Sequence, residues 1–170
     1  MLDINLRDDT LVIKNIQKDS IKRIYPIYRN IEDFKYATGI FDKIEFEQFL
    51  QHISQFILRN NVFFVDISFA EGEIIGLIKG TVIFKENVVW INSMAITTQQ
   101  QSKGYGEKAV RLLENHFKNE GIKKIYLSVD WNNEHGIKFW NKCGYLRIEN
   151  LCELEVKKFN KFVQIMCKIL

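Results

Sequence analysis

Apolar side chains recur along the chain with two periods, and each period predicts a type of element. The clearest helical face lies within residues 42–58, where apolar positions repeat at helical spacing. These positions are Phe46, Phe49, Leu50, Ile53, Phe56 and Ile57. A second amphipathic helix is predicted from Glu107 to Glu120, with Gly121 as its expected C-terminal cap.

Two further helices are predicted from residues that commonly cap a helix start. Asp19 or Ser20 is expected to start the first, and Pro26 is expected to kink or shorten it. Asn132 or Asn133 is expected to start the other, which is short and reaches Trp140.

Runs rich in β-branched and aromatic residues predict strands between these helices. Such runs occupy residues 10–16, 62–69, 74–84, 88–96, 124–130, 145–156 and 162–170. The three runs within residues 62–96 are expected to form an antiparallel meander, whereas the run at 124–130 should pair in parallel with that at 88–96, because a helix separates them. The predicted fold class is α/β (α+β), with a single mixed, mostly antiparallel sheet of about seven strands and helices on both faces.

The composition fits one globular domain over residues 1–170. Hydrophobic residues make up 46% of the chain and charged residues 26%, which is enough apolar material for a core and too much for a disordered chain. The net charge is +3, but the Lys and Arg residues are scattered. We therefore expect no nucleic-acid surface, although this charge suits a small anionic ligand.

Cysteine spacing and the absence of long apolar runs indicate the cellular compartment that we expect. Cys143, Cys152 and Cys167 have neither metal-ligand spacing nor a disulfide framework, so we expect no metal and a reducing compartment. No segment reaches the roughly 18 uninterrupted apolar residues of a membrane span, and residues 1–9 do not resemble a signal peptide. The expected location is the cytoplasm, without membrane contact.

Two glycines, Gly104 and Gly106, stand just before the helix predicted from Glu107. The first N–H groups of a helix lack partners inside the helix, and the helix dipole favours an anion there. Because glycine has no Cβ, a phosphate could approach the backbone closely, with Lys103 adding a positive charge. A plain turn between strand and helix explains the two glycines equally well. The dinucleotide and P-loop motifs do not fit these residues.

Two motifs together carry a family resemblance. Residues 101–106, Gln-Ser-Lys-Gly-Tyr-Gly, follow the strand predicted to end at Ile96 and fit the pattern Q/R-x-x-G-x-G/A. Residues 133–145, Asn-Glu-His-Gly-Ile-Lys-Phe-Trp-Asn-Lys-Cys-Gly-Tyr, fit N-x-x-A-x-x-F/L-Y-x-x-x-G-F/Y except for glycine at the usual Ala and Trp140 at the usual Tyr. In this order the motifs resemble those of the GNAT family of acyl-CoA-dependent N-acetyltransferases. The likeness covers about residues 88–145, and the order of elements extends it over most of the chain.

The GNAT resemblance implies a coenzyme site. The strands ending at Ile96 and Asp130 would splay apart, and acetyl-CoA would lie in the wedge between them. Backbone groups of Met94 and Ile96 would pair with the pantetheine arm, amides of residues 101–106 would hold the pyrophosphate, and Asn133 would contact the arm from the other side. The implied coenzyme-binding residues are Met94, Ala95, Ile96, Gln101, Ser102, Lys103, Gly104, Tyr105, Gly106, Asn133 and Trp140.

The resemblance also implies direct attack of a neutral primary amine on the thioester of acetyl-CoA, with no covalent enzyme intermediate. Family members often use a tyrosine as proton donor where this chain has Trp140, and some use a glutamate base where it has Trp90. Indole offers only an N–H donor, so both usual groups are missing. Asn92 and Tyr145 are the polar candidates for positioning the reactants.

The acceptor is expected to be a small-molecule or peptide amine, and the chain a monomer or homodimer. An α-amino group with a pKa of about 7.7 is about one-sixth neutral at pH 7, whereas a lysine-type amine near 10.4 is neutral about four times in ten thousand. An acidified amine would therefore need little help from a base.

Two other functions fit parts of the sequence. A non-catalytic acyl-CoA-binding module would explain Trp90 and Trp140 at the usual base and acid positions, and enzyme-dependent turnover of any amine would exclude it. A nucleotide-phosphate binder unrelated to CoA would explain the glycine loop alone, and it would prefer ATP to CoA.

Overall fold

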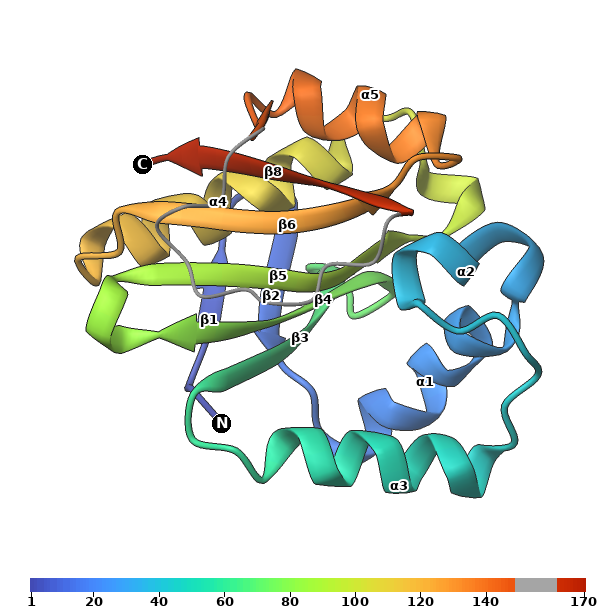
Figure 1. The fold of residues 1–170 in the computed structure, drawn as a ribbon. Helices are drawn as coiled ribbons and strands as arrows, with labels where there is room; N and C mark the ends of the chain where they lie inside the picture. The colour runs from blue at the N-terminus through green and yellow to red at the C-terminus, as the bar shows by residue number, and fades with distance from the viewer. Residues whose placement is uncertain (149–161) are drawn as a thin grey trace.

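An eight-stranded mixed sheet forms the centre of the fold (Figure 1). The computed structural model describes residues 1–148 and 162–170. The strand order is β1-β2-β3-β4-β5-β6-β8-β7, and among these residues only the β5–β6 pair is parallel. The strands are β1 (Asn5–Arg7), β2 (Leu11–Asn15), β3 (Val62–Phe69), β4 (Ile74–Ile83), β5 (Val88–Ile96), β6 (Lys124–Asp130), β7 (Leu146–Arg147) and β8 (Val163–Ile169).

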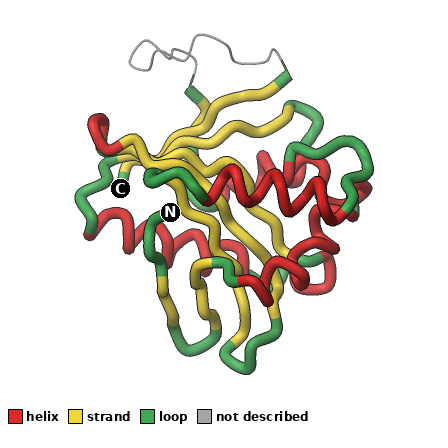
Figure 2. The backbone as a smooth tube through the Cα atoms, turned by 90° about the horizontal axis from the view of Figure 1, so that it is seen from below, coloured by secondary structure: helices red, strands yellow, loops and turns green. Residues whose placement is uncertain are grey.

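Helices cover both faces of this sheet (Figures 1 and 2). They are α1 (Lys18–Arg29), α2 (Ile31–Thr38), α3 (Phe46–Ile57), α4 (Tyr105–Asn119) and α5 (Glu134–Lys142). Phe117 of α4 and Trp140 of α5 share a core with Ile91 of β5, whereas Phe49 of α3 packs with Leu77 of β4 in a second core. We call these two sides of the sheet the α4 face and the α1 face.

The main features of the predicted fold are confirmed. Strands β3, β4 and β5 form an antiparallel meander, and the helix α4 separates the parallel neighbours β5 and β6. Gly121 follows α4 with a φ of 81°, a left-handed conformation that glycine adopts easily after a helix.

Several boundaries differ from the prediction for local physical reasons. The sheet has eight strands rather than about seven, because the short strand β1 pairs with β2. Helix α2 was not predicted; the side chain of Asn30 caps it by accepting from the N–H of Asp33 at 3.2 Å. Helix α1 begins before Asp19, and the hydroxyl of Ser20 donates to buried Asp66 at 2.6 Å instead of capping the helix.

The observed ends of α1, α3 and β7 also differ from the predicted bounds. Pro26 lies inside α1, which ends at Arg29, and α3 starts at Phe46. Of the strand predicted over residues 145–156, β7 contains only Leu146–Arg147, and residues 149–156 lie outside the described part of the chain.

Glycines in β4 let the α4 face pack closely against the sheet. A Cβ on Gly80 would overlap the ring of Phe63 and the carbonyl oxygen of Trp90. The Phe63 ring in turn lies 5.2 Å from the ring of Phe117 on α4. The missing side chain at position 80 therefore makes room for the aromatic contact between sheet and helix.

We expect Gly80→Ala to lower the free energy of unfolding by about 1–3 kcal/mol, the usual range for overpacking a core. Urea denaturation of the wild-type and variant proteins measures this difference. The cost should shrink in a Phe63→Leu background, because most of the ring is then absent. An equal cost in both backgrounds would contradict this packing role for Gly80.

Candidate functional site

Strands β5 and β6 begin as neighbours and then part. Their parallel register ends at Ile91 opposite Leu127, although β5 continues to Ile96 and β6 to Asp130. The expected splaying of the two strands is therefore present. We call the segments beyond the last pair, residues 92–96 of β5 and 128–130 of β6, the fork.

A β-bulge in β5 marks the start of the fork. On β4, Gly80 pairs with Ile91 and Lys79 pairs with Ser93, so Asn92 is an extra residue between two pairs. A bulge bends its strand and increases the local twist. This bend provides a physical reason why β5 leaves β6 at this point.

The bulge residue Asn92 is exposed and lies on the same face as Trp90. Thr81 pairs with Trp90 in the register, and its hydroxyl donates to Oδ1 of Asn92 at 3.0 Å. The Trp90 ring stacks on that of Tyr126 of β6, with the ring centroids 5.4 Å apart. The α1 face of the fork thus presents an amide beside an indole.

The loop after β5 leads into an uncapped helix start. Gly104 precedes α4 with a φ of 86°, and Ser102 has a φ of 60°. No side chain caps α4, and the N–H of Lys108 makes the first turn's bond, to the carbonyl of Gly104 at 3.0 Å. The N–H groups just before Lys108 therefore have no partner within the helix, which is the arrangement that binds anions.

Helices α2, α3 and α5 differ from α4 in this respect, whereas α1 also starts without a side-chain cap. Side chains of Asn30, Glu45 and Asn133 cap α2, α3 and α5. Among these helices, only α4 offers free N–H groups at its start together with a glycine that leaves open space, because nothing lies within 4 Å of a Cβ built on Gly104.

Gly106 has a packing role that the sequence did not predict. A Cβ at this position would lie 3.0 Å from the Phe139 ring of α5 and 3.5 Å from the Ile96 side chain. The missing Cβ therefore allows α4, α5 and the end of β5 to pack together, and the place of Gly106 in a phosphate site stays a prediction. Its backbone N–H still lies in the first turn of α4.

Gln101 connects the loop to the fork. Its side-chain Nε2 donates to the carbonyl of Ile96 at 2.9 Å, so that carbonyl, expected to pair with the pantetheine arm, already has a protein partner. Lys103 is exposed, and its Nζ donates to Oε1 of Gln100 at 3.1 Å. The loop is thus held beside the strand end while its charged side chain points to solvent.

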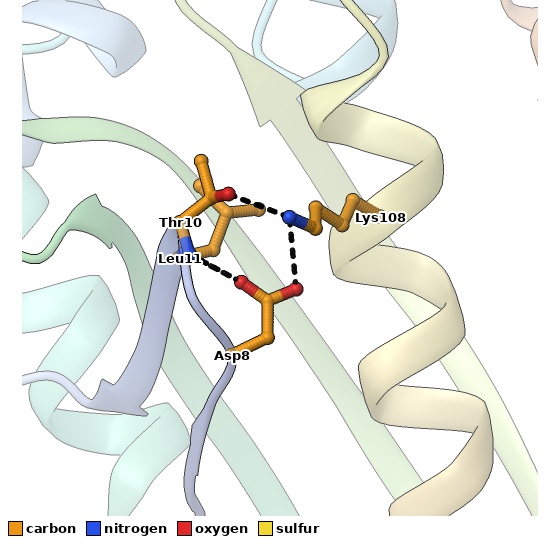
Figure 3. Close-up of polar contacts among 4 residues, drawn as sticks. All are labelled: Asp8, Thr10, Leu11 and Lys108. Atoms are coloured by element: carbon orange, nitrogen blue, oxygen red, sulfur yellow. Dashed lines mark hydrogen bonds and ion pairs between the residues drawn. The ribbon is translucent and has the colours of Figure 1, made fainter.

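Lys108 fastens the start of α4 to the turn between β1 and β2 (Figure 3). Its Nζ lies 3.2 Å from Oδ2 of Asp8 and donates to the Thr10 hydroxyl at 2.6 Å. Oδ1 of Asp8 accepts from the N–H groups of Thr10 and Leu11 at 2.7 and 2.8 Å. Partial burial by itself would raise the pKa of Asp8, but the hydrogen bonds from Leu11 and Thr10 and the charge of Lys108 outweigh it and hold that pKa below its ordinary 3.8.

Comparison with known proteins decides the family. The model of the acetyltransferase (GNAT) family matches residues 21–145, which is more than half of the chain. The chain belongs to the GNAT family. The matched part contains most of α1, all of α2 to α5 and the fork, so the family match includes the residues of the candidate site.

Sequence relatives within the GNAT family match over a shorter stretch. The spermine/spermidine N(1)-acetyltransferase of Bacillus subtilis is 34% identical over 62 residues, which is 36% of this chain and 41% of that protein. A probable spermine N(1)-acetyltransferase of Bacillus subtilis subsp. natto matches to the same extent. The chain thus spans about two fifths of the length of these curated relatives.

Solved structures with the same fold cover nearly the whole chain. The spermidine N-acetyltransferase of Vibrio cholerae in complex with CoA and spermine has a TM-score of 0.76 at 18% identity, covering 95% of this chain and 96% of that one. An acetyltransferase of Salmonella typhimurium, which modifies the N-terminal serine of a ribosomal protein, has a TM-score of 0.80 at 14% identity, covering 98% and 99%. At these identities the likeness concerns the fold.

The second GNAT motif forms the start of α5. Oδ1 of Asn133 accepts from the N–H of Gly136 at 2.9 Å, so part of this side chain caps the helix. A Cβ on Gly136 would overlap the Asn133 amide in its present position. The predicted contact of Asn133 with the coenzyme stays a prediction.

Trp140 and Tyr145 belong to the core of the α4 face. Trp140 is 8% exposed, and its ring lies 4.9 Å from that of Phe139 and 5.0 Å from that of Tyr145. Tyr145 is fully buried, and burial together with the charge of Glu114 raises the pKa of its hydroxyl. Tyr145 thus takes part in packing, and the role predicted for it in positioning the reactants stays a prediction.

Sequence reasoning missed Lys79, which pairs with Ser93 across the bulge. Lys79 is 8% exposed, and burial lowers its pKa to about 8. The available signal was a lone lysine within the apolar strand β4, Ile-Ile-Gly-Leu-Ile-Lys-Gly-Thr-Val-Ile. Within residues 1–148 and 162–170 no group of three or more His, Cys, Asp or Glu gathers to hold a metal ion, and no helix has the length and apolar character to cross a membrane.

We expect Asp8→Asn to lower stability at pH 7 by up to about 1 kcal/mol, because it removes the partner of a partly exposed Lys108. A carboxyl whose folded-state pKa is depressed stabilises the fold above its unfolded pKa and loses this effect as the pH falls through its folded value. The difference between wild type and variant should therefore be constant from pH 7 to about 5 and shrink below about 4. Urea denaturation at each pH measures it.

The neighbouring Asp9 provides the matched control for this prediction. Asp9 is exposed, so Asp9→Asn should change stability by less than about 0.5 kcal/mol over the same range. A deficit in Asp8→Asn that persists unchanged at pH 3 would show that the charge of Asp8 is not the stabilising element.

Proposed function

We propose that this chain is an acetyl-CoA-dependent N-acetyltransferase that acetylates a primary amine. The observation that carries the proposal is the combination of the fork with the uncapped start of α4, joined by the bond from Gln101 to the Ile96 carbonyl. The fork leaves an unpaired edge of β5 for an extended arm, and the helix start offers N–H groups and a positive dipole end for a diphosphate. Acetyl-CoA carries both chemical features on one molecule.

In this proposal the residues of the chain bind and orient the two reactants. Residues 92–96 would pair with the pantetheine arm, and the N–H groups from Gln101 to Gly106 would hold the pyrophosphate. The amine would approach from the α1 face, where Asn92 and Trp90 lie beside the bulge. Its nitrogen attacks the thioester carbon, the carbon–sulfur bond breaks, and the products are an N-acetyl amine and the free thiol of CoA.

A small-molecule amine is the acceptor class we propose. The Bacillus subtilis relatives are named for spermine or spermidine, and the Vibrio cholerae structure contains spermine. An N-terminal peptide amine is the second class to test, because the Salmonella typhimurium neighbour modifies an N-terminal serine. One screen that includes a polyamine and a peptide with a free N-terminus would separate these two acceptor classes.

A non-catalytic acyl-CoA-binding module is the competing function. Trp90 and Trp140 at the usual base and acid positions favour it, and so does the burial of Tyr145. Such a module would bind the coenzyme as tightly as an enzyme does but would not release thiol with any amine.

We expect acetyl-CoA at about one hundred times its dissociation constant to stabilise the protein by about 2.7 kcal/mol, or roughly 5 to 11 °C in melting temperature. Gly104→Ala should abolish most of this shift, because a Cβ at its φ of 86° strains the loop that presents the N–H groups. Gly121→Ala is the matched control, with a φ of 81° and equally open surroundings at the other end of α4. It should lose similar stability but keep the full shift.

Thiol release then separates an enzyme from a binding module. The wild-type protein would be incubated with acetyl-CoA and spermidine, or with a peptide that begins with serine, and free CoA measured over time. Release that depends on both protein and amine supports the enzyme. A full thermal shift without release from any amine would favour the binding module, and no shift at all would overturn both.

A further inference from the structure

Lys79 lies at the bulge where the fork begins. It pairs with Ser93 across β4 and β5, and Asn92, the extra residue of the bulge, is the neighbour of that pair. Strands in a sheet are about 4.8 Å apart, so the lysine backbone is one strand away from the edge of β5 that the fork leaves unpaired.

The side chain of Lys79 is directed into the α1 face. Its Nζ lies 5.4 Å from the ring centroid of Tyr28 on α1 and 5.5 Å from that of Phe56 on α3. Only 8% of the residue is exposed, and no carboxylate forms an ion pair with it among residues 1–148 and 162–170. Buried lysines are ordinarily paired, so an amine held over two rings without a carboxylate is unusual.

Titratable groups surround this amine from three elements. Tyr28 faces it from α1, and burial raises the pKa of that phenol, so it is neutral at ordinary pH. On α3, burial lowers the pKa of His52, and the nearby charge of Lys79 lowers it further. Asp66, on β3, pairs with Leu77 rather than with Lys79, and it accepts from the Ser20 hydroxyl. None of these groups compensates for the burial of the ammonium.

Two residues that contact Lys79 or pair with it carry a buried hydroxyl with no protein partner within the described part of the chain. They are Tyr28 and Ser93. A buried hydroxyl without a hydrogen bond costs free energy, so such atoms point to a bound group or water. The ring of Tyr28 lies under the Lys79 amine, and Ser93 pairs with Lys79 in the strand register.

We propose that Lys79 is the proton carrier of the acetyl transfer, taking the proton from the attacking amine and returning it to the leaving thiolate. This inference rests on the proposed function. The amine lone pair forms the new C–N bond, the neutral Nζ accepts the nitrogen proton, and the C–S bonding pair leaves with sulfur. The Lys79 ammonium then gives its proton to that sulfur, so the lysine is regenerated and no other reactant is needed.

Burial makes this amine suited to proton transfer. With a pKa of about 8, Lys79 is neutral in about a tenth of the molecules at pH 7, against about four in ten thousand for an ordinary lysine. A proton carrier works best when its pKa is near the working pH. Lys79 would then act as both the base and the acid, the two functions for which Trp90 and Trp140 are unsuited.

Two variants test the proposal against a purely structural role. Lys79→Arg keeps a cation over the two rings but cannot give up its proton near neutral pH, and Lys79→Met keeps the length without charge. We expect either variant to lower kcat at least about 100-fold, the lower range for general acid–base catalysis, with a thermal shift by acetyl-CoA within about 1 °C of wild type. Lys35→Met is the matched control, because Lys35 also lies over a tyrosine ring, 5.2 Å from that of Tyr36.

The pH dependence of kcat provides a second readout that a structural role would not change. In wild type, kcat should rise with pH through a midpoint near 8 to a plateau above about 9, because Lys79 must be neutral. The midpoint should be the same for an α-amino peptide and for spermidine. The Arg variant should lose this midpoint.

Each other outcome overturns the proposal. If Lys79→Arg keeps kcat within about fivefold of wild type, Lys79 does not carry the proton. The same holds if the pH midpoint of kcat differs between the two acceptors. In both cases the proposed acetyltransferase function still stands. If wild type binds acetyl-CoA but acetylates no amine, the proposed function fails and the role of Lys79 fails with it.

Discussion

The early end of pairing between β5 and β6 is the constraint on which the candidate site depends. A parallel pair normally uses the backbone groups of both strands along their shared length, and here that use stops at Ile91 opposite Leu127. The bulge at Asn92 provides the bend that separates the strands, and Gly80 on β4 leaves the room that this register needs. One extra residue in β5 thus creates, within the described residues, a strand edge that β6 does not pair.

The other parts of the site are arranged around this edge. Gln101 ties the glycine loop to the last carbonyl of β5, and the closeness of Gly106 to Phe139 draws α4 and α5 together there. Lys108 fixes the first turn of α4 to the β1–β2 turn through Asp8 and Thr10. These contacts fix the start of α4 relative to the fork. The N–H groups of the helix start and the strand edge of the fork can therefore bind the same long ligand.

Much of this arrangement could be predicted from the sequence, and the reasons for the failures are specific. Periodicity located α3, α4 and the strands β3 to β6, because long regular elements repeat their apolar positions. The three-residue strand β1 carries no such repeat, and the bulge at Asn92 leaves no mark in the sequence because it is a property of pairing. The burial of Tyr145 was not predicted for a related reason, since a motif identifies a residue type but does not reveal which side chains the core encloses.

Hydrogen exchange with and without acetyl-CoA tests the central claim most directly. Amides at an uncapped helix start and on an unpaired strand edge exchange quickly in the free protein. The account predicts that acetyl-CoA slows exchange in two separate segments, residues 92–96 and residues 102–107, while the C-terminal turn of α4 is unchanged. Unchanged exchange in both segments, with slowing confined to another surface, would contradict it.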